Sequence, residues 1–318
     1  MGPDGALVER FRIDLDGLIA PDERLGIAVS GGPDSLALLL LAAAARPDAI
    51  EAATVDHGLR PDSRAEADMV AAVCARLGVP HAILTADWPE PPATAVQERA
   101  RDMRYRLLAA WLAERSLAAL ATAHHADDQA ETVVMRLNRG SGVRGLAGMR
   151  PAATVPSSQF PLLRPLLGWR RSELGRICAD AGLDPATDPS NADDQYERVR
   201  VRKALARTGV LDGAAVARSA RNLGEADEAL DWIAESLAAA RVTDDAEALR
   251  IDPAGLPREI LRRIVRVAFL RFHAPEPRGP ELERALDALA TGATLTLSGL
   301  KLEGGATWRL TKAPDRRA

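Results

Sequence analysis

A glycine-rich turn lies between two apolar runs near the start of the chain. Residues 28–40 read AVSGGPDSLALLL, where two adjacent glycines and a proline mark a sharp change of direction. Such a turn between a strand and a helix presents backbone N–H groups to an anion. Neither the kinase-type phosphate loop nor the GxGxxG dinucleotide fingerprint is present, so both of those classes are excluded. The turn consists of Ser30, Gly31, Gly32, Pro33, Asp34 and Ser35.

Asp34 is the unusual member of this turn, because a carboxylate at the start of a helix repels phosphate. A divalent cation between the two removes the conflict, so Asp34 is a candidate magnesium ligand. The plainer alternative is that Ser30 or Asp34 caps the following helix, since both residue types are good N-caps.

A second polar cluster, AHHADDQAET, occupies residues 123–132. Asp128 and Glu131 are three residues apart and would share one helical face. A carboxylate here could complete a metal site with Asp34 across the phosphates of ATP. The HExxH spacing of zinc enzymes is absent. The alternative is structural, with Asp128 and Glu131 in a capping box and both histidines hydrogen-bonded in a turn.

A third polar segment, VDHGLRPDS, occupies residues 55–63 and follows another apolar run. The backbone groups of Val55, Asp56 and His57 are suited to hold a base and a ribose. The alternative is a simple turn, which Pro61 and Ser63 favour.

Four short apolar runs must position these segments. Residues 25–30, 50–56, 81–86 and 117–123 are typical of buried strands, and a helical pattern at 63–77 separates two of them. Alternating strands and helices predict an α/β fold with a doubly wound parallel sheet and ligands at the carboxyl ends of its strands. We therefore expect the three polar segments along one rim.

The rest of the chain predicts further helices and a second domain. Residues 141–165 are typical of a loop, and helical patterns cover 170–181, the segment from Tyr196, and 213–240. A helix at 258–272 and strand-like TLTLSGLKL and ATWRLT indicate a small α+β domain. We expect a catalytic domain over 1–210, a connecting helix over 211–241 and a C-terminal domain over 242–318.

The arginines are unevenly distributed. The net charge is −4, yet seven arginines and no acidic residue lie between Glu131 and Glu173. This pattern indicates either contact with a polyanion or a solvated loop. Arg258, Arg262 and Arg266 form a further stripe on one helical face, and the same two interpretations apply to it.

Composition indicates the compartment. The two cysteines, Cys74 and Cys178, have no ligand-type spacing, which argues against a disulfide scaffold, structural zinc and an iron–sulfur cluster. The longest apolar stretch, Leu36 to Ala45, is far shorter than the ~20 residues of a membrane helix. The N-terminal residues carry charges throughout and lack a secretory pattern. We expect a cytoplasmic protein without membrane contact.

Taken together, the motifs resemble those of a known family. SGGPDS, VDHGLR, TAHHADDQAET, RGSGVRGLAGM, RPLL and DPSNADDQYERVRVR are similar to the tRNA(Ile)-lysidine synthetases, a branch of the N-type ATP pyrophosphatases, or PP-loop enzymes. The resemblance covers residues 25 to about 207. ERVRVR departs from it, because Val199 stands where the family usually has Asn.

The resemblance implies a reaction in two steps. ATP activates the C2 carbonyl oxygen of the wobble cytidine of tRNA(Ile) with a CAU anticodon, and pyrophosphate leaves. The ε-amine of L-lysine then displaces AMP to give lysidine. The amides of Gly31, Gly32 and Ser35 would hold pyrophosphate, and Mg²⁺ would bind Asp34 and Asp128. His124 would contact the α-phosphate, and Glu131 or Asp128 would accept the lysine proton.

The resemblance also implies tRNA contacts, for which the arginine-rich segments are natural phosphate ligands. They include Arg139, Arg144, Arg198, Arg200, Arg202 and Lys203. Two alternatives stay open, a tRNA thiolase on the same fold and a non-catalytic tRNA-binding protein. A homodimer is one open arrangement of the chain.

Overall fold

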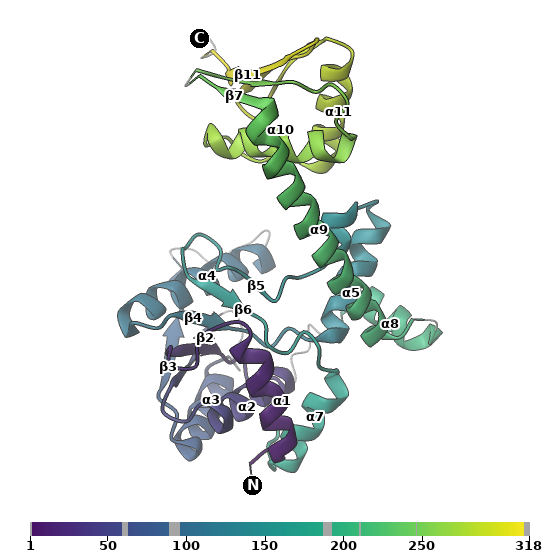
Figure 1. Ribbon diagram of the computed structural model, residues 1–318. Coiled ribbons are helices and arrows are strands. Elements are labelled where there is room, and N and C mark those ends of the chain that lie inside the picture. The colour runs from purple at the N-terminus through teal and green to yellow at the C-terminus, as the bar shows by residue number, and fades with distance from the viewer. Residues whose placement is uncertain are drawn as a thin grey trace. The chain divides into compact units, whose positions relative to one another are not determined.

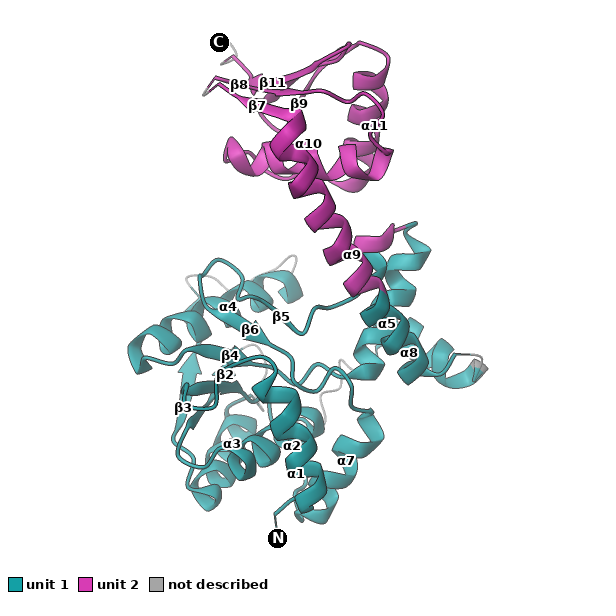
Figure 2. Ribbon diagram, in the orientation of Figure 1, with its two compact units in different colours: residues 1–140, 145–222 teal, residues 141–144, 223–318 magenta. Residues whose placement is uncertain are grey.

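The computed structural model describes residues 2–58, 63–88, 96–186, 193–209, 211–245 and 247–314. The chain forms two compact units (Figure 2). The first contains residues 1–140 and 145–222, and the second contains 141–144 and 223–318. The boundary at residue 222 falls inside the 29-residue helix α9 (Gly213–Arg241), which therefore contributes to both units.

A mostly parallel sheet forms the centre of the first unit (Figure 1). Its strand order is β3-β2-β1-β4-β6-β5, and only β5 runs antiparallel to its neighbour. The predicted doubly wound parallel sheet is confirmed, and the four predicted strands form. The bounds are β1 (Leu25–Ala28), β2 (Ile50–Asp56), β3 (His81–Thr85), β4 (Ala119–Ala121), β5 (Ala152–Thr154) and β6 (Pro161–Leu163).

The prediction that residues 141–165 are a loop is wrong in part. This segment contains β5, β6 and the short helix α6 (Val143–Leu146). Strand β6 joins the sheet beside β4, with Leu120 opposite Leu162, and both leucines are at most 1% exposed. The three residues of β6 begin with proline and have only a weak intrinsic preference for a strand. They form one because their leucines are buried against a sheet that already contains β4.

Helices cover both faces of this sheet, because successive side chains of each strand point to opposite sides. Ile27 and Leu163 face the cluster built from α1, α2, α3 and α7, whereas Leu120 and Leu162 face α4. The helix bounds are α1 (Gly5–Asp16), α2 (Pro33–Ala45), α3 (Ser63–Leu77), α4 (Val96–Arg115), α5 (Ala126–Asn138), α7 (Arg171–Asp180) and α8 (Glu197–Thr208).

Helix α2 is apolar on every side because it lies within the core. Its five leucines are at most 4% exposed, and it packs against both α1 and α7. Burial of each leucine stabilises the fold by roughly 1.5–3 kcal/mol. The N-terminus of α2 is thereby fixed at the end of β1, where the glycine-rich turn lies.

The second unit is a small α+β structure, as the sequence predicts. Its sheet is antiparallel in the order β7-β8-β11-β10-β9 and packs against α10, α11 and the end of α9. The bounds are β7 (Val242–Asp244), β8 (Ala248–Ile251), α10 (Arg258–Arg271), α11 (Gly279–Ala290), β9 (Thr294–Leu297), β10 (Leu300–Glu303) and β11 (Trp308–Lys312). In the described part of the chain, no helix is long and apolar enough to cross a membrane.

Candidate active site

The glycine-rich turn is held open at the N-terminus of α2. Gly32 is the N-cap and Pro33 the first helical residue, so the alternative that Ser30 or Asp34 caps this helix is wrong. The Ser35 hydroxyl donates to the Gly32 carbonyl at 2.9 Å, and the Ser30 N–H donates to the Ser35 hydroxyl at 3.1 Å. Gly31 has φ +84°, a conformation that favours glycine. At this end of α2, Gly32, Pro33 and Asp34 are partly exposed, whereas Gly31 and Ser35 are buried.

Asp34 lies in the first turn of α2, with one carboxylate oxygen near a histidine and the other unsatisfied. Its Oδ2 is 3.4 Å from Nε2 of His125. Its Oδ1 is buried and makes no hydrogen bond within the described residues. A buried carboxylate oxygen without a partner costs free energy. A bound cation would remove that cost.

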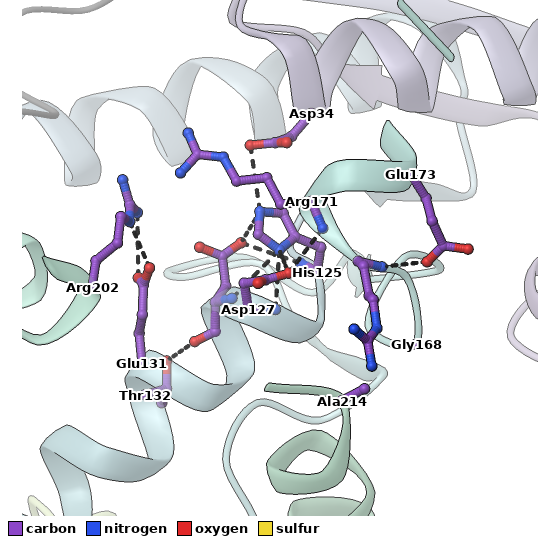
Figure 3. Close-up of polar contacts among 12 residues, drawn as sticks. Asp34, His125, Asp127, Glu131, Thr132, Gly168, Arg171, Glu173, Arg202 and Ala214 are labelled. Carbon is purple, nitrogen blue, oxygen red and sulfur yellow. Dashed lines mark hydrogen bonds and ion pairs between the residues drawn. The ribbon is translucent and has the colours of Figure 1, made fainter. Parts of the chain in front are cut away.

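His125 begins helix α5 and contacts three carboxylates (Figure 3). It is 3% exposed, and its Nε2 is 3.5 Å from the Asp128 carboxylate. A capping box exists here, but it joins His125 to Asp128, so the structural alternative of an Asp128–Glu131 box is wrong. Burial lowers the pKa of His125, but hydrogen bonds to Asp127 and Asp34 and the charge of Asp128 outweigh it and raise the pKa to about 10.

Asp127 is a residue that the sequence analysis did not select. Its carboxylate accepts the backbone N–H of Arg171 at 2.8 Å, which joins the start of α5 to the start of α7. The hydrogen bond from His125 and this backbone contact lower the pKa of Asp127 to about 2. Asp127 is thus ionised and holds α5 and α7 together beside the cluster. The sequence feature that could have identified His125 and Asp127 is their position at the start of a helix that follows a strand.

His124 points to different partners. Its Nδ1 lies 2.9 Å from the Thr122 hydroxyl. Burial, aided by the charges of Arg164, Arg198 and Arg101, lowers the pKa of His124 to about 4. The ring is therefore neutral near pH 7 and can meet a phosphate through a hydrogen bond.

Glu131 is buried one turn further along α5 and is held by two arginines of α8. Its carboxylate accepts from Nε of Arg198 at 2.8 Å. It also accepts from Nε of Arg202 at 2.6 Å (Figure 3). Arg198 also lies 3.6 Å from Asp128. Both arginines were expected to contact tRNA, whereas their observed partners are the carboxylates of the cluster.

The other expected tRNA contacts have partners at the surface. Arg139 pairs with Glu197, Arg144 lies 3.1 Å from Asp231, and Lys203 lies 2.7 Å from Asp194. Arg200 donates to the carbonyls of Asp194 and Gln195, each at 2.8 Å. The segment that lacks acids in the sequence therefore meets acids from distant parts of the chain.

The end of β2 forms a further part of the rim. Asp56 accepts the hydroxyl of Ser63 at 2.7 Å and the N–H of Gly58 at 3.0 Å, which lower its pKa against the effect of burial. The Trp88 indole donates to the His57 carbonyl at 2.8 Å, and Val55 is half-buried. Pro61 of the simple-turn alternative lies outside the described residues.

Comparison with known proteins places this geometry in a class. The family model of the PP-loop domain matches residues 7–208. The U34-tRNA thiolase NcsA from Methanococcus maripaludis with its 4Fe-4S cluster has a similar fold, with a TM-score of 0.57 and 17% identity over 69% of this chain and 80% of that chain. The chain is a PP-loop protein.

Relatives along nearly the whole length identify the branch. The tRNA(Ile)-lysidine synthase of Novosphingobium aromaticivorans is 48% identical over 97% of this chain and 94% of the relative. That of Zymomonas mobilis subsp. mobilis is 44% identical over 92% of this chain and 90% of the relative. The chain belongs to the tRNA(Ile)-lysidine synthase family.

Proposed function

We propose that this protein is a tRNA(Ile)-lysidine synthetase acting in the cytoplasm on the wobble cytidine of tRNA(Ile) with a CAU anticodon. The C2 carbonyl oxygen attacks the α-phosphorus of ATP, and pyrophosphate leaves. The ε-amine of L-lysine then attacks C2, loses a proton and displaces AMP. The observation that carries the proposal is the meeting of Asp34 and Asp128 at one buried histidine, beside the N-terminus of α2 in a PP-loop domain.

The residues present fit a magnesium ion shared with ATP. Mg²⁺ usually binds one or two carboxylates together with phosphates and waters. Asp34 and Asp128 supply two carboxylates, and the buried Oδ1 of Asp34 makes no hydrogen bond to any described residue. Mg²⁺ would neutralise charge on the leaving pyrophosphate.

The chain's own groups would orient the nucleotide. The amides of Gly31, Gly32 and Ser35 lie at the start of α2, where backbone N–H groups and the helix dipole favour a phosphate. The neutral ring of His124 would form a hydrogen bond to the α-phosphate. Nucleotidyl transfer depends mainly on such positioning and on charge stabilisation.

Asp128 is the better candidate for accepting the proton of lysine. Both carboxylate oxygens of Glu131 already accept guanidinium N–H groups, from Arg198 and Arg202. The side chain of Asp128 is 16% exposed and accepts the backbone N–H of His125 at 3.1 Å, while Arg198 lies further away, at 3.6 Å. Glu131 would act by holding the two arginines beside the substrates.

The tRNA would be bound by surface arginines and a lysine whose present carboxylate partners are replaced by tRNA phosphates. The ion pairs of Arg139, Arg144 and Lys203 are about half exposed, and such pairs contribute only ~0–1 kcal/mol each. A phosphate can therefore replace the carboxylate at little cost. Arg200 presents a further cation on α8, next to the arginines that hold Glu131.

The cysteines argue against the thiolase alternative. Burial raises the pKa of Cys74 to about 12 and that of Cys178 to about 11. The Cys178 thiol donates to the Pro33 carbonyl at 3.1 Å. Thiolates that attack or carry sulfur need a lowered pKa and access to substrate, and neither condition is met.

Labelled lysine tests the proposal. The protein is incubated with radiolabelled lysine, Mg-ATP and total bacterial tRNA, and the nucleosides are then separated. We expect label in a single modified cytidine, with one AMP and one pyrophosphate formed per lysine. Pyrophosphate release without label would contradict the lysine reaction, and the absence of both would indicate a non-catalytic tRNA-binding protein.

A further inference from the structure

The Nδ1 edge of the His125 ring faces the start of α5, and the Nε2 edge faces the carboxylates of Asp34 and Asp128. Its Nδ1 lies 3.2 Å from the backbone nitrogen of Asp127 and 3.4 Å from that of Asp128, and it is also 3.5 Å from Oδ2 of Asp127. Its Nε2 lies 3.4 Å from Asp34 and 3.5 Å from Asp128 (Figure 3). A neutral ring whose Nδ1 accepts from the helix carries its proton on Nε2, and a charged ring does so as well. In both states an N–H group faces Asp34 and Asp128.

This N–H group joins two elements that are distant in the sequence. Asp34 belongs to α2, which follows the glycine-rich turn, and Asp128 belongs to α5. Two carboxylates that approach each other repel, unless a positive or donor group lies between them. The 3.4 and 3.5 Å separations exceed those of a strong charge-assisted bond, so one donor is shared between both.

The shared donor faces one oxygen, Oδ2, of each carboxylate. Asp128 Oδ2 also accepts the His125 backbone N–H at 3.1 Å, so this carboxylate is oriented at two points. On Asp34, Oδ2 faces the ring while the buried Oδ1 makes no hydrogen bond within the described residues. An oriented carboxylate with a free oxygen beside a phosphate-binding turn suits a cation that is shared with ATP.

We propose that His125 is a positioning residue, which orients Asp34 and Asp128 for the cation that accompanies ATP. This inference rests on the proposed function. His125 touches neither nucleotide nor cation in this role, because its two nitrogens are engaged by α5 and by the two carboxylates. Groups that orient a metal ligand through a hydrogen bond change metal affinity by about 10–100-fold when they are removed.

Two substitutions separate the two edges of the ring. His125→Asn keeps an oxygen that can cap α5, since Asn is a good N-cap, but it is too short to reach Asp34. His125→Gln places an amide N–H nearer the carboxylates and lacks the cap. His81→Asn is the matched control, because His81 is a half-buried histidine of the same unit whose ring bonds Thr54 at 2.9 Å.

The readout is the gain in affinity for a non-cleavable ATP analogue, α,β-methylene-ATP, when Mg²⁺ is added. We expect His125→Asn to unfold at the same temperature as the wild type. The increase in affinity that Mg²⁺ causes should be about 10–100-fold smaller in this variant than in the wild type. His125→Gln should unfold at a lower temperature and keep more of the gain. His81→Asn should keep all of it. A wild-type gain in folded His125→Asn, or equal losses in both His125 variants, would overturn the proposal.

A measurement on the wild-type protein tests the proposal even if the variants fail to fold. Nitrogen NMR of the histidine rings, with Mg²⁺ and the analogue bound, should find Nε2 of His125 protonated. An unprotonated Nε2 would overturn the positioning role. Lysine incorporation by the wild type is scored separately. Its absence, with the Mg²⁺-dependent binding pattern intact, would reject the proposed function and keep the role of His125.

Discussion

At the scale of single residues, the charge of Asp34 and Asp128 should decide the first chemical step. We expect Asp34→Asn and Asp128→Asn each to lower ATP-dependent pyrophosphate release by orders of magnitude, because each removes a charge that would bind the cation. Affinity for tRNA should stay nearly unchanged. Asp68→Asn is the control, since Asp68 forms an exposed pair with Arg64 on α3. Near-normal turnover of either variant at saturating Mg²⁺ would exclude that residue as a ligand.

His124 should make the stability of the free protein depend on pH. Its pKa is about 4 in the folded state, against 6.5 for an ordinary histidine. Between these values the unfolded chain binds more protons, so the free energy of unfolding falls as pH drops from 6.5 towards 4. The full loss is on the order of 3 kcal/mol, at about 1.4 kcal/mol per pKa unit.

Urea unfolding of the wild type and of His124→Asn at pH 7, 5.5 and 4.5 measures this effect. The difference between the two proteins isolates His124 from other groups that titrate in the same range. We expect the substitution to flatten the decline below pH 6.5. Parallel curves for both proteins would show that His124 is not kept neutral by the fold.

The thiols of the two cysteines should be unreactive in the folded protein. Their raised pKa values predict that neither Cys74 nor Cys178 reacts with iodoacetamide in the native protein at pH 8, whereas both react in urea. The Cys74→Ala/Cys178→Ala variant should lose some stability from the cavities and keep lysine ligation. Mass spectrometry measures the labelling. Loss of ligation in a folded double variant would return the thiolase alternative to consideration.

At the scale of elements, α9 and α10 are joined by a buried ion pair. Arg263 and Asp227 are 3% and 2% exposed and 2.7 Å apart, and Arg263 also contacts Asp231 and lies 2.9 Å from Glu259. Removing one partner of a buried pair leaves an uncompensated charge. We expect Arg263→Met to destabilise the second unit by about 3–5 kcal/mol.

A double variant tests the cause of this loss. Arg263→Met combined with Asp227→Leu replaces both charges with apolar groups of similar size, so most of the stability should return. Thermal unfolding of the single variant, the double variant and the wild type measures this recovery of stability. If the double variant is no more stable than Arg263→Met, the cost arises from packing and not from the loss of the charge that faces Asp227.

The success of sequence-based prediction also differs between elements. Runs such as 50–56 are buried on both faces, so apolar character alone locates them. Strand β6 has three residues and becomes a strand because β4 is already beside it, which no local pattern contains. Helix α11 and strands β7 and β8 were not predicted. The two strands have three and four residues and acquire their order from the shared core around Phe269 and Leu286. Helix α11 has 12 residues, and its buried residues Leu282, Ala285, Leu286 and Leu289 have a helical spacing that could have located it.

The candidate site illustrates the same limit. The order of motifs along the chain indicates Asp34 and Asp128, because each follows a strand at one rim. Only the structure shows which of the two rings, His124 or His125, faces Asp34 and Asp128. Motif spacing in the sequence does not distinguish two adjacent histidines. The arginine partners of Glu131 come from more than sixty residues away in the sequence. Such contacts follow from the fold and not from any local motif.

At the scale of the whole molecule, the arginine stripe of α10 is largely neutralised within its own unit. Arg258 contacts Glu283 and Asp287, Arg262 contacts Glu283, and Arg266 pairs with Glu276. To bind a phosphate, these arginines would have to leave their carboxylates. The ion pairs therefore favour a packing role over a tRNA contact, and both interpretations make different predictions for the dependence of tRNA binding on salt.

Shortening the chain separates these interpretations. The two apolar clusters of the first unit contain no residue beyond Leu183, whereas Leu230, Ala234 and Leu237 of α9 belong to the core of the second unit. A fragment that ends at Asn222 should therefore fold and bind Mg-ATP with the affinity of the full chain. A cut after residue 241 would leave apolar side chains of α9 without their core.

The affinity for tRNA, measured against salt concentration, decides the role of the second unit. Each phosphate contact that is lost lowers the slope of log K against log salt by about 0.7–0.9. We expect a smaller slope for the fragment ending at Asn222 and a nearly unchanged slope for the Arg258/Arg262/Arg266 triple alanine variant, because the three arginines are already paired. An equal fall in both would mean that the stripe itself contacts tRNA. An unchanged slope in the fragment would mean that the second unit neutralises no phosphate and acts in packing or assembly.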